Sequence, residues 1–324
     1  MKQVLVTGAG GFIGSHLVER LVAEGLAVRA LVRYNSRNAW GWLDDSPVRG
    51  SVEVVTGDIR DFDSVRSAVR GTDSVFHLAA LIGIPYSYVS PLAYIQTNVV
   101  GTYNVLQAAR DEGLSRIVVT STSETYGSAQ YVPIDELHPA VGQSPYAATK
   151  VAADQLALSY HKSFGLPVTV VRPFNTFGPR QSARAIIPTL ITQALAGSGK
   201  IQVGSLDPTR DLTFVEDTVS GFLAAVRCDS LVGHAVNVGM GTEISIRDLA
   251  ARILALSGST ATLETDSRRV RPDAGEVTRL LADASLLRER TGWKPAHTLD
   301  QGLEKTLSWV RAHLDRYKSD LYNV

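Results

Sequence analysis

Near the N-terminus, residues 3–14 read QVLVTGAGGFIG, a short apolar run that leads into closely spaced glycines. The apolar run predicts a β-strand, and the glycines predict a tight turn into a helix. Gly8 permits the turn, Gly11 lets the backbone approach a diphosphate, and Gly14 lets the helix pack closely on the strand. The amides of Phe12 and Ile13 then lie at the helix start, where a phosphate is favoured. The stretch therefore predicts a dinucleotide-binding turn.

Beyond this turn, apolar runs alternate with helical periodicity as far as Arg172. Such alternation is typical of a doubly wound parallel sheet with helices on both faces. We therefore expect an α/β protein with a Rossmann domain over residues 1–173. A smaller α/β substrate-binding lobe is expected over residues 174–324, with residues 235–238 returning to the sheet and an amphipathic last helix packed on the body. The expected strands are 3–7, 27–32, 52–56, 74–78, 116–120 and 168–172, and the expected helices are 11–24, 61–69, 92–112, 145–164 and 299–314.

Bulk composition argues against several classes of protein. The 324 residues carry 32 basic and 32 acidic side chains, so we expect no bulk attraction for nucleic acid or an anionic membrane. Apolar residues make up 44% of the chain, yet no run approaches the roughly 18 apolar residues of a membrane span. The one cysteine, Cys228, excludes an internal disulfide, and no spaced set of ligand residues predicts a metal site. These features predict a cytoplasmic globular protein.

The second expected strand lacks the terminal acidic residue that commonly binds the ribose 2′-hydroxyl of NAD. It is followed by Arg33, Ser36 and Arg37, whose side chains could hold a 2′-phosphate, so NADP is favoured. NAD binding without the acidic residue, with these side chains solvated, is the alternative. After the third strand, Asp58, beside Ile59, is placed to accept a hydrogen bond from the adenine amino group or to cap the next helix.

Tyr146 and Lys150 lie four residues apart in an expected helix, so their side chains share one helix face. An ammonium and a cationic nicotinamide ring both favour the phenolate, so Tyr146 could act as a base near neutral pH. Lys150 would also hold the nicotinamide ribose. The Ser/Thr-rich segment 120–124 precedes this pair at the carboxyl end of a strand, which is the edge where such folds bind ligands.

With these residues, the chain resembles the extended short-chain dehydrogenases/reductases of the NAD-dependent epimerase/dehydratase family over essentially its whole length. In that family the sugar C4 hydroxyl is oxidised transiently. The resemblance implies that Thr122 and Tyr146 contact this hydroxyl, that Lys150 supports the tyrosine, and that the cofactor passes beside residues 78–80. The residues that carry it are the glycine turn, Gly57-Asp58, His77-Leu78-Ala79-Ala80, Asn98, residues 122–124, Tyr146 with Lys150, and Arg172-Pro173-Phe174-Asn175.

Glu124 favours a 4,6-dehydratase within this family. A 4-keto group makes the C5 proton acidic, and a carboxylate beside it can remove that proton. The dTDP-glucose 4,6-dehydratases carry an Asp where this chain has Ser123, which weakens that assignment. We therefore expect Glu124, once protonated, to assist the loss of water as well. Residues 33–44, 81–88 and 209–214 look most like the GDP-N-acetylglucosamine 4,6-dehydratases of legionaminic acid synthesis.

Two other functions stay open. A UDP-glucuronate decarboxylase or a nucleotide-sugar 4-epimerase would use the same C4 oxidation with a different fate for the ketone. A non-enzymatic, cofactor-sensing protein on the same fold is a remote alternative, because such a protein is expected to lose the Tyr146–Lys150 pair that is present here with Glu124.

A nucleotide-diphosphate sugar carries two phosphates, so a neutral chain must bind it through local cations. For two of the candidate arginines, Arg180 and Arg184, a surface ion pair is the alternative. Pro85 and Tyr86 are expected to contact the substrate, and Asn175 its diphosphate. The candidate cations are Arg180, Arg184, Arg210 and Arg271.

The remaining expectations concern structure. Asn98 is expected to bond backbone groups near the site, and His77 to pack beside the cofactor without acting as a base or a metal ligand. The helices over residues 92–112 and 145–164 resemble those that form a four-helix dimer interface in relatives. The resemblance therefore implies a homodimer.

Overall fold

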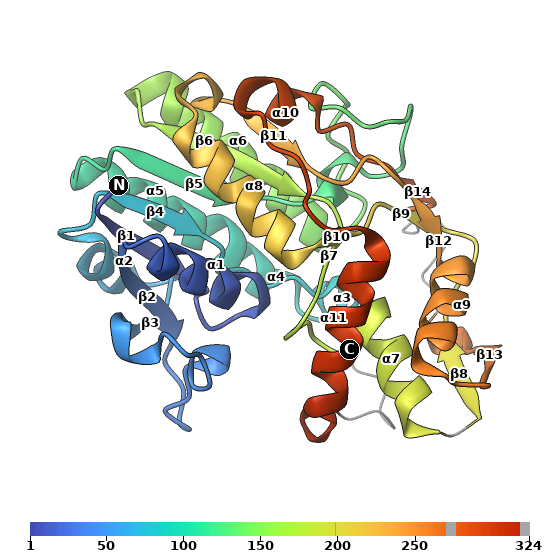
Figure 1. The fold of residues 1–324 in the computed structure, drawn as a ribbon. Coiled ribbons are helices and arrows are strands. Elements are labelled where there is room, and N and C mark those ends of the chain that lie inside the picture. The colour runs from blue at the N-terminus through green and yellow to red at the C-terminus, as the bar shows by residue number, and fades with distance from the viewer. Residues whose placement is uncertain (198, 270–276, 318–324) are drawn as a thin grey trace.

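The computed structural model describes residues 1–197, 199–269 and 277–317. At its centre is a seven-stranded parallel sheet in the order β11-β6-β5-β4-β1-β2-β3 (Figure 1). The strand order reverses beside β1, which confirms the expected doubly wound arrangement. The strands are β1 (Gln3–Thr7), β2 (Ala27–Arg33), β3 (Val52–Gly57), β4 (Ser74–His77), β5 (Arg116–Thr120), β6 (Val168–Pro173) and β11 (Ala235–Val238).

Helices cover both faces of this sheet. Successive strand residues point to opposite faces, so Val4 and Val6 of β1 join one core while Leu5 joins the other. Because neither face meets solvent, the strands are apolar throughout, as their continuous apolar runs predicted. The helices are α1 (Phe12–Ala23) and α8 (Val215–Arg227) on the first face, and α2 (Phe62–Val69), α5 (Gly101–Asp111) and α6 (Pro145–Phe164) on the second.

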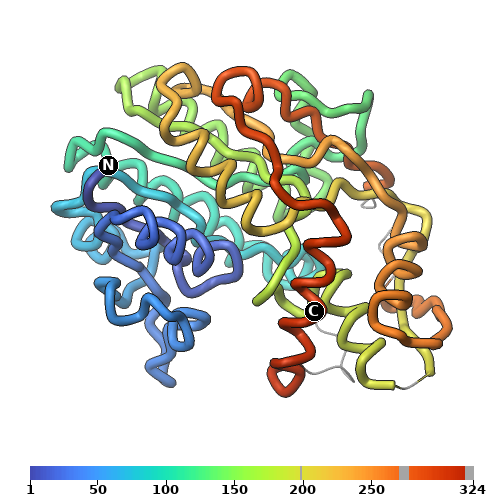
Figure 2. Tube along the Cα trace, viewed as in Figure 1, coloured from blue at the N-terminus to red at the C-terminus, as the bar shows by residue number. Residues whose placement is uncertain are grey.

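A further core lies away from the sheet, where helices α7, α9 and α11 pack together (Figure 1). Phe12 and Ile13, at the start of α1, also pack against this core, so the N-terminal turn contacts both parts of the protein. Figure 2 follows the chain out of the sheet after β6, back to it through α8 and β11, and out again to α11. The elements are α7 (Ile186–Ala196), β8 (Lys200–Val203), α9 (Ile246–Ser257), β13 (Thr262–Thr265) and α11 (Leu299–Ala312).

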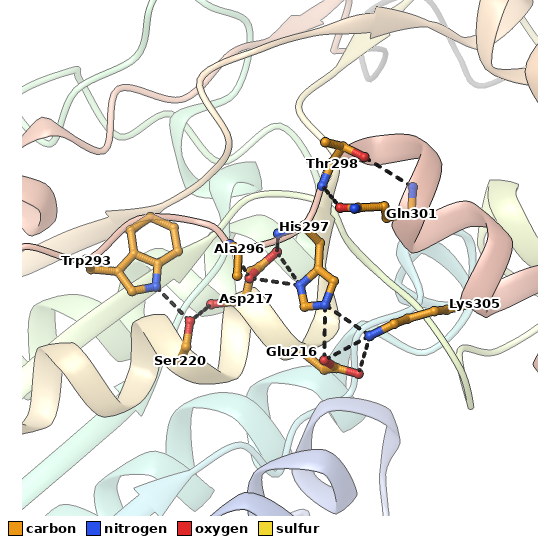
Figure 3. A network of polar contacts seen from close by, with 9 residues as sticks. All are labelled: Glu216, Asp217, Ser220, Trp293, Ala296, His297, Thr298, Gln301 and Lys305. Carbon is orange, nitrogen blue, oxygen red and sulfur yellow. Dashed lines mark hydrogen bonds and ion pairs between the residues drawn. The ribbon is translucent and has the colours of Figure 1, made fainter.

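A polar network connects residues 296–297, just before α11, to α8 (Figure 3). Asp217, 2% exposed, accepts hydrogen bonds from the amides of Ala296 and His297 at 2.8 and 3.1 Å. It also contacts His297 Nδ1 at 3.2 Å. On the other side of the ring, His297 Nε2 lies 3.0 Å from Lys305 Nζ and 3.3 Å from Glu216 Oε2. Glu216 completes the network on the solvent side.

The prediction of a single helix over residues 92–112 is wrong in one respect. A π-helical segment, Ile95–Val100, separates α4 (Pro91–Tyr94) from α5. Within it the Asn98 side chain bonds both the amide and the carbonyl of Leu81, at 2.8 and 2.9 Å. Asn98 thus has the structural contacts expected of it, and the wider turn hardly disturbs the apolar periodicity from which the helix was predicted. The other expected elements agree with the structure to within two residues at each end.

Within the described residues, no helix has both the length and the apolar character needed to cross a bilayer.

Candidate active site

The predicted strand–turn–helix unit is present, and its glycines are sterically required. Gly8 has φ +68°, and a Cβ on it would lie 2.7 Å from the backbone nitrogen of Ala79. A Cβ on Gly14 would lie 2.2 Å from the carbonyl oxygen of Gly8, so the close packing of α1 on β1 needs glycine. The Gly11 amide donates to that same carbonyl at 3.0 Å, and α1 begins at Phe12. The first amides of the helix lack acceptors within it, which suits a diphosphate.

A segment around Trp42 packs directly on this turn, and sequence reasoning missed it. A Cβ on Gly10 would lie 2.2 Å from the carbonyl oxygen of Trp40, and one on Gly41 would lie 2.4 Å from the carbonyl oxygen of Gly10. The Trp42 amide donates to the Gly10 carbonyl at 3.0 Å. The Trp42 ring packs edge-on against Trp309 of α11, with centroids 5.2 Å apart. The glycine between two tryptophans was the signal that could have revealed this contact.

The residues expected at a 2′-phosphate lie on an ordered, exposed turn. Arg33 ends β2, and Arg33, Ser36 and Arg37 are all exposed. Asn35 orders the turn, because its Nδ2 donates to the carbonyl of Arg33 at 3.0 Å and its Oδ1 accepts from the amide of Arg37 at 3.1 Å. The three side chains are therefore exposed on one ordered turn at the carboxyl end of the second strand.

Asp58 follows β3 and is paired with Arg60. The Arg60 guanidinium donates from Nε to Oδ1 at 2.9 Å, and this hydrogen bond is the main cause that holds the pKa of Asp58 below its usual range. The interpretation of Asp58 as a helix cap is wrong, because the cap of α2 is Asp61, whose side chain accepts from the amide of Ser64 at 2.8 Å. Ile59 is buried in the core between the sheet and helices α2, α5 and α6.

The end of β4 lies against the glycine turn. His77 contacts Thr7 Oγ1 through Nδ1 at 2.8 Å and Thr102 Oγ1 through Nε2 at 3.1 Å. Burial lowers the pKa of His77 to about 3, so the imidazole is neutral. With both ring nitrogens engaged, His77 packs as a structural residue beside Gly8. The residues that follow it along this edge are Leu78, Ala79 and Ala80.

On the neighbouring strand, the Ser/Thr-rich segment forms a capped turn. The chain leaves β5 after Thr120 and enters a 3-10 turn, Ser123–Tyr126. Thr122 caps this turn, because its Oγ1 accepts from the amide of Glu124 at 3.2 Å. Ser123 is 1% exposed, whereas Glu124 is half-buried. The turn therefore presents the carboxylate more openly than the serine.

The α6 helix brings the predicted tyrosine and lysine to this turn. Both lie on the buried face of α6, which begins after its cap residue Ser144. The Thr122 hydroxyl lies close enough to the phenol of Tyr146 to lower its pKa, and Lys150 Nζ donates to the carbonyl of Thr120 at 2.6 Å. Thr122, Glu124, Tyr146 and Lys150 thus meet at the carboxyl edge of the sheet.

The electrostatics of this cluster indicate what the expected phenolate requires. Burial raises the pKa of Tyr146, the hydrogen bond from Thr122 opposes that rise, and the charge of Glu124 adds to it. Burial also lowers the pKa of Lys150, and the charge of Asp154 opposes this. The lysine alone therefore does not outweigh burial, so the expected phenolate depends on a second cation such as a nicotinamide ring.

A row of aromatic rings leads from the cluster toward the expected substrate residues. Tyr146 meets Tyr94 edge-on with centroids 6.3 Å apart, and Tyr94 meets Tyr86 at 6.2 Å. Tyr86 and Pro85 lie on α3 (Ile84–Val89). Burial raises the pKa of Tyr94, and the charge of the exposed Arg184 is the largest effect that opposes it. Arg184 therefore lies close to this row.

The other expected substrate residues are not gathered as closely. Arg180 forms an ion pair with Glu19, with Nη2 and Oε1 2.8 Å apart, so for this residue the ion-pair alternative holds. Arg210 is 7% exposed and donates to the carbonyl of the preceding residue at 2.8 Å. Asn175 is half-buried between β6 and β7 (Thr176–Phe177). Arg271 lies outside the described residues.

The turn, the end of β4 and α6 fit a dinucleotide cofactor. A Cβ at Gly8 or Gly14 would clash with backbone, so only glycine allows this turn, and a helix start beside it favours a diphosphate. Lys150 has three N–H donors and uses one on Thr120, which leaves donors for a ribose. No group of three or more His, Cys, Asp or Glu in the described part of the chain is placed to hold a metal ion.

A doubly wound sheet, a glycine turn and a Tyr-Lys pair at the sheet edge define a dinucleotide-binding protein of the short-chain dehydrogenase/reductase type. A family model described as GDP-mannose 4,6 dehydratase matches residues 5–306. The chain belongs to this family, within the extended short-chain dehydrogenases/reductases that act as nucleotide-sugar dehydratases, decarboxylases and epimerases.

Relatives of known activity cover nearly the whole chain. A dTDP-glucose 4,6-dehydratase of Streptomyces antibioticus is 33% identical over 315 residues, covering 95% of this chain and 92% of the relative. A UDP-N-acetyl-alpha-D-glucosaminuronate decarboxylase of Bacillus cytotoxicus is 33% identical over 322 residues, covering 96% and 98%. The solved structure of DesIV, a dTDP-glucose 4,6-dehydratase of Streptomyces venezuelae with NAD bound, matches with a TM-score of 0.87 and 30% identity over 98% of this chain and 99% of that one. The narrower likeness to GDP-N-acetylglucosamine 4,6-dehydratases stays a prediction.

Proposed function

We propose that the protein is a nucleotide-sugar 4,6-dehydratase that converts its substrate to a 4-keto-6-deoxy sugar nucleotide. The observation that supports this most directly is the meeting of Thr122, Glu124 and Tyr146 at one strand end. A 4-epimerase needs a base for the C4 hydroxyl and no second base at C5. A half-buried carboxylate next to the tyrosine supplies the second base that dehydration requires.

In the proposed reaction, the chain supplies the proton transfers. NAD(P)+, when bound, supplies a hydride acceptor and donor. Tyr146, which lies beside Thr122, takes the proton of the C4 hydroxyl as C4 becomes a ketone. Glu124 then takes the acidified C5 proton and returns it to the C6 hydroxyl, which leaves as water. C6 would then receive the hydride and C5 a proton, and the proton that Tyr146 took from the C4 hydroxyl balances this last transfer. Ser123 is buried and its hydroxyl is a weak acid, so the proposal gives both transfers at C5 and C6 to Glu124.

Product mass tests this proposal against its alternative. The protein is incubated with a panel of GDP-, UDP- and dTDP-linked sugars, without added cofactor and then with NAD+ or NADP+. We expect a GDP-linked hexose to lose one water, in line with the likeness to GDP-sugar dehydratases. Loss of carbon dioxide from UDP-glucuronate, or an isomer of unchanged mass, would replace the dehydratase by a decarboxylase or an epimerase.

We also propose that residues 174–324 form most of the substrate side of the site. The aromatic row that ends at Tyr86 supports this, because Arg184 from the later part of the chain lies beside it. A cytoplasmic location is part of the proposal and is consistent with a single, unpaired cysteine. The residues assigned to the substrate are Pro85, Tyr86, Asn175, Arg184, Arg210 and Arg271.

For the cofactor, we propose a preference for NADP over NAD. Arg33, Ser36 and Arg37 on their ordered turn support it, and the NAD bound in the solved relative stands as the alternative. Replacing Arg33 by Asp should weaken NADP+ binding about 10- to 100-fold, the effect of losing a charged hydrogen bond to phosphate. Isothermal titration calorimetry with both dinucleotides measures this. Arg247→Asp, an exposed arginine of α9, is the matched control, and a wild-type protein that binds NAD+ more tightly than NADP+ would contradict the preference.

We further propose a homodimer through a four-helix bundle, in which α4, the π segment and α5 pack together with α6 against the same elements of the partner. Leu92, Ile95 and Tyr103 are 63%, 47% and 44% exposed on this stretch, an apolar set that a partner would cover. Ile95→Asp should convert the dimer to a monomer in sedimentation velocity at micromolar concentration. Leu137→Asp, which changes an 88% exposed leucine in a turn outside these helices, should leave the dimer intact. A monomeric wild-type protein would contradict the proposal.

A further inference from the structure

Behind the Tyr146–Lys150 pair lies a buried set of charges that the proposed proton transfers do not use. Asp154 is one turn further along the same buried face of α6 and is 1% exposed. Its Oδ2 accepts from Ser121 Oγ at 2.8 Å and from Arg172 Nε at 3.0 Å. Arg172, on β6, is itself 5% exposed. A carboxylate and a guanidinium are thus held in the core directly behind the candidate site.

A buried ion pair between Asp154 and Arg172 adds little net stability to the packing of α6 on β6. Taking both charges out of water offsets much of their attraction, and apolar residues of similar volume would often stabilise the core as well. Among the described residues, Asp154 Oδ1 has no hydrogen-bond partner, which adds to the cost. An explanation confined to packing therefore leaves this arrangement unaccounted for.

The group that benefits from the carboxylate is Lys150. It is 4% exposed, and burial favours loss of its proton. Asp154 on α6 is the charged group that acts on Lys150, and two further titratable groups lie near it, Tyr146 on the same buried face of α6 and His77 on β4. His77 is neutral, since burial lowers its pKa to about 3, and burial keeps the proton on Tyr146. Burial raises the pKa of Asp154 as well, and the charge of Arg172 is the largest effect that opposes this rise. As a carboxylate, Asp154 is the negative charge that opposes the effect of burial on Lys150.

We propose that Asp154 is a positioning residue whose carboxylate, oriented by Arg172 and Ser121, keeps Lys150 in its ammonium form. Through Ser121 the same carboxylate joins α6 to the residue that precedes Thr122, so the lysine and the capped turn are held as one unit. This role rests on the proposed function, yet the charge of Lys150 is a property of the chain that can be measured without turnover.

The test is a direct titration of Lys150 in protein without added cofactor. The chain has seven lysines, so selective carbon-13 labelling of lysine side chains gives few NMR signals, and Lys150→Met identifies one of them. Asp154→Asn keeps the size of the side chain and removes its charge. The Lys150 midpoint should then fall by about one pH unit, as expected when a nearby opposite charge is lost. Ser121→Ala keeps the charge and should move the midpoint much less.

A second variant covers the case in which Asp154→Asn does not fold. That substitution leaves Arg172 buried without its counter-charge, whereas Asp154→Asn/Arg172→Gln removes both charges together. The double variant should also lower the Lys150 midpoint. An unchanged midpoint in the folded variants would overturn the proposal and leave Asp154 as a structural residue.

Turnover gives an independent readout. Because Lys150 loses its charge as pH rises, Asp154→Asn should move the alkaline decline of kcat to lower pH, with KM for the sugar nucleotide unchanged. A uniform fall in kcat at every pH would indicate structural damage and count against the proposal. If the wild-type protein turns over no sugar nucleotide, the proposed function fails, and the lysine titration still decides the role of Asp154.

Discussion

Replacing Glu124 by glutamine should slow product formation about 10²- to 10⁴-fold, the contribution of a positioned general base, while sparing the first oxidation. Glutamine keeps the volume of the side chain, and the amide of residue 124 can still donate to Thr122. Burial is the largest cause that raises the pKa of Tyr146, and the charge of Glu124 raises it further. Its removal should therefore lower that pKa and shift the onset of C4 oxidation to lower pH.

Single-turnover absorbance and product mass separate these effects. Reduced nicotinamide and a 4-keto sugar that has kept its water should accumulate in Glu124→Gln protein. Glu304→Gln, an exposed position on α11, should behave as wild type. Release of water at the wild-type rate from Glu124→Gln protein would remove Glu124 from the mechanism and assign the C5 proton to another group.

Replacing Tyr146 by phenylalanine should stop the reaction one step earlier. The loss removes the group that takes the C4 hydroxyl proton, and we expect turnover to fall about 10²- to 10⁴-fold. Unlike Glu124→Gln protein, this variant should accumulate no reduced nicotinamide when it is mixed with substrate.

The pH dependence of the wild-type enzyme provides a second comparison. Burial raises the pKa of Tyr146, so below that pKa the phenol keeps its proton and cannot act as a base. Oxidation should therefore quicken as pH rises through the ionisation of Tyr146, and Tyr146→Phe protein should lose that rise. Unchanged turnover in the variant would show that another group takes the proton.

The sequence predicted those features that local rules determine. Strand positions follow from apolar runs, and Gly8 and Gly14 are dictated by a turn that tolerates no Cβ. Tyr146 and Lys150 share a face because they are one helical turn apart. Each of these conclusions needs residues that are neighbours in the chain or in one element.

What the sequence did not predict depends on contacts between distant segments. Asp154 and Arg172 lie 18 positions apart and meet because α6 packs on β6. The protonation state of Tyr146 follows from burial, which depends on the whole fold. Asp58 was expected to bind adenine or cap a helix, yet it is paired with Arg60, two residues away, through a loop geometry that no periodicity encodes.

The contact of Trp40 and Trp42 with the glycine turn also makes the protein its own optical sensor. The chain has four tryptophans, and three of them, Trp40, Trp42 and Trp309, lie at this turn or in contact with the segment that packs on it. Indole emission responds to nearby rings and charges, so a dinucleotide seated on the turn should change the fluorescence of the unlabelled protein. Cofactor exchange and any movement between the turn and α11 could then be followed in real time without a dye.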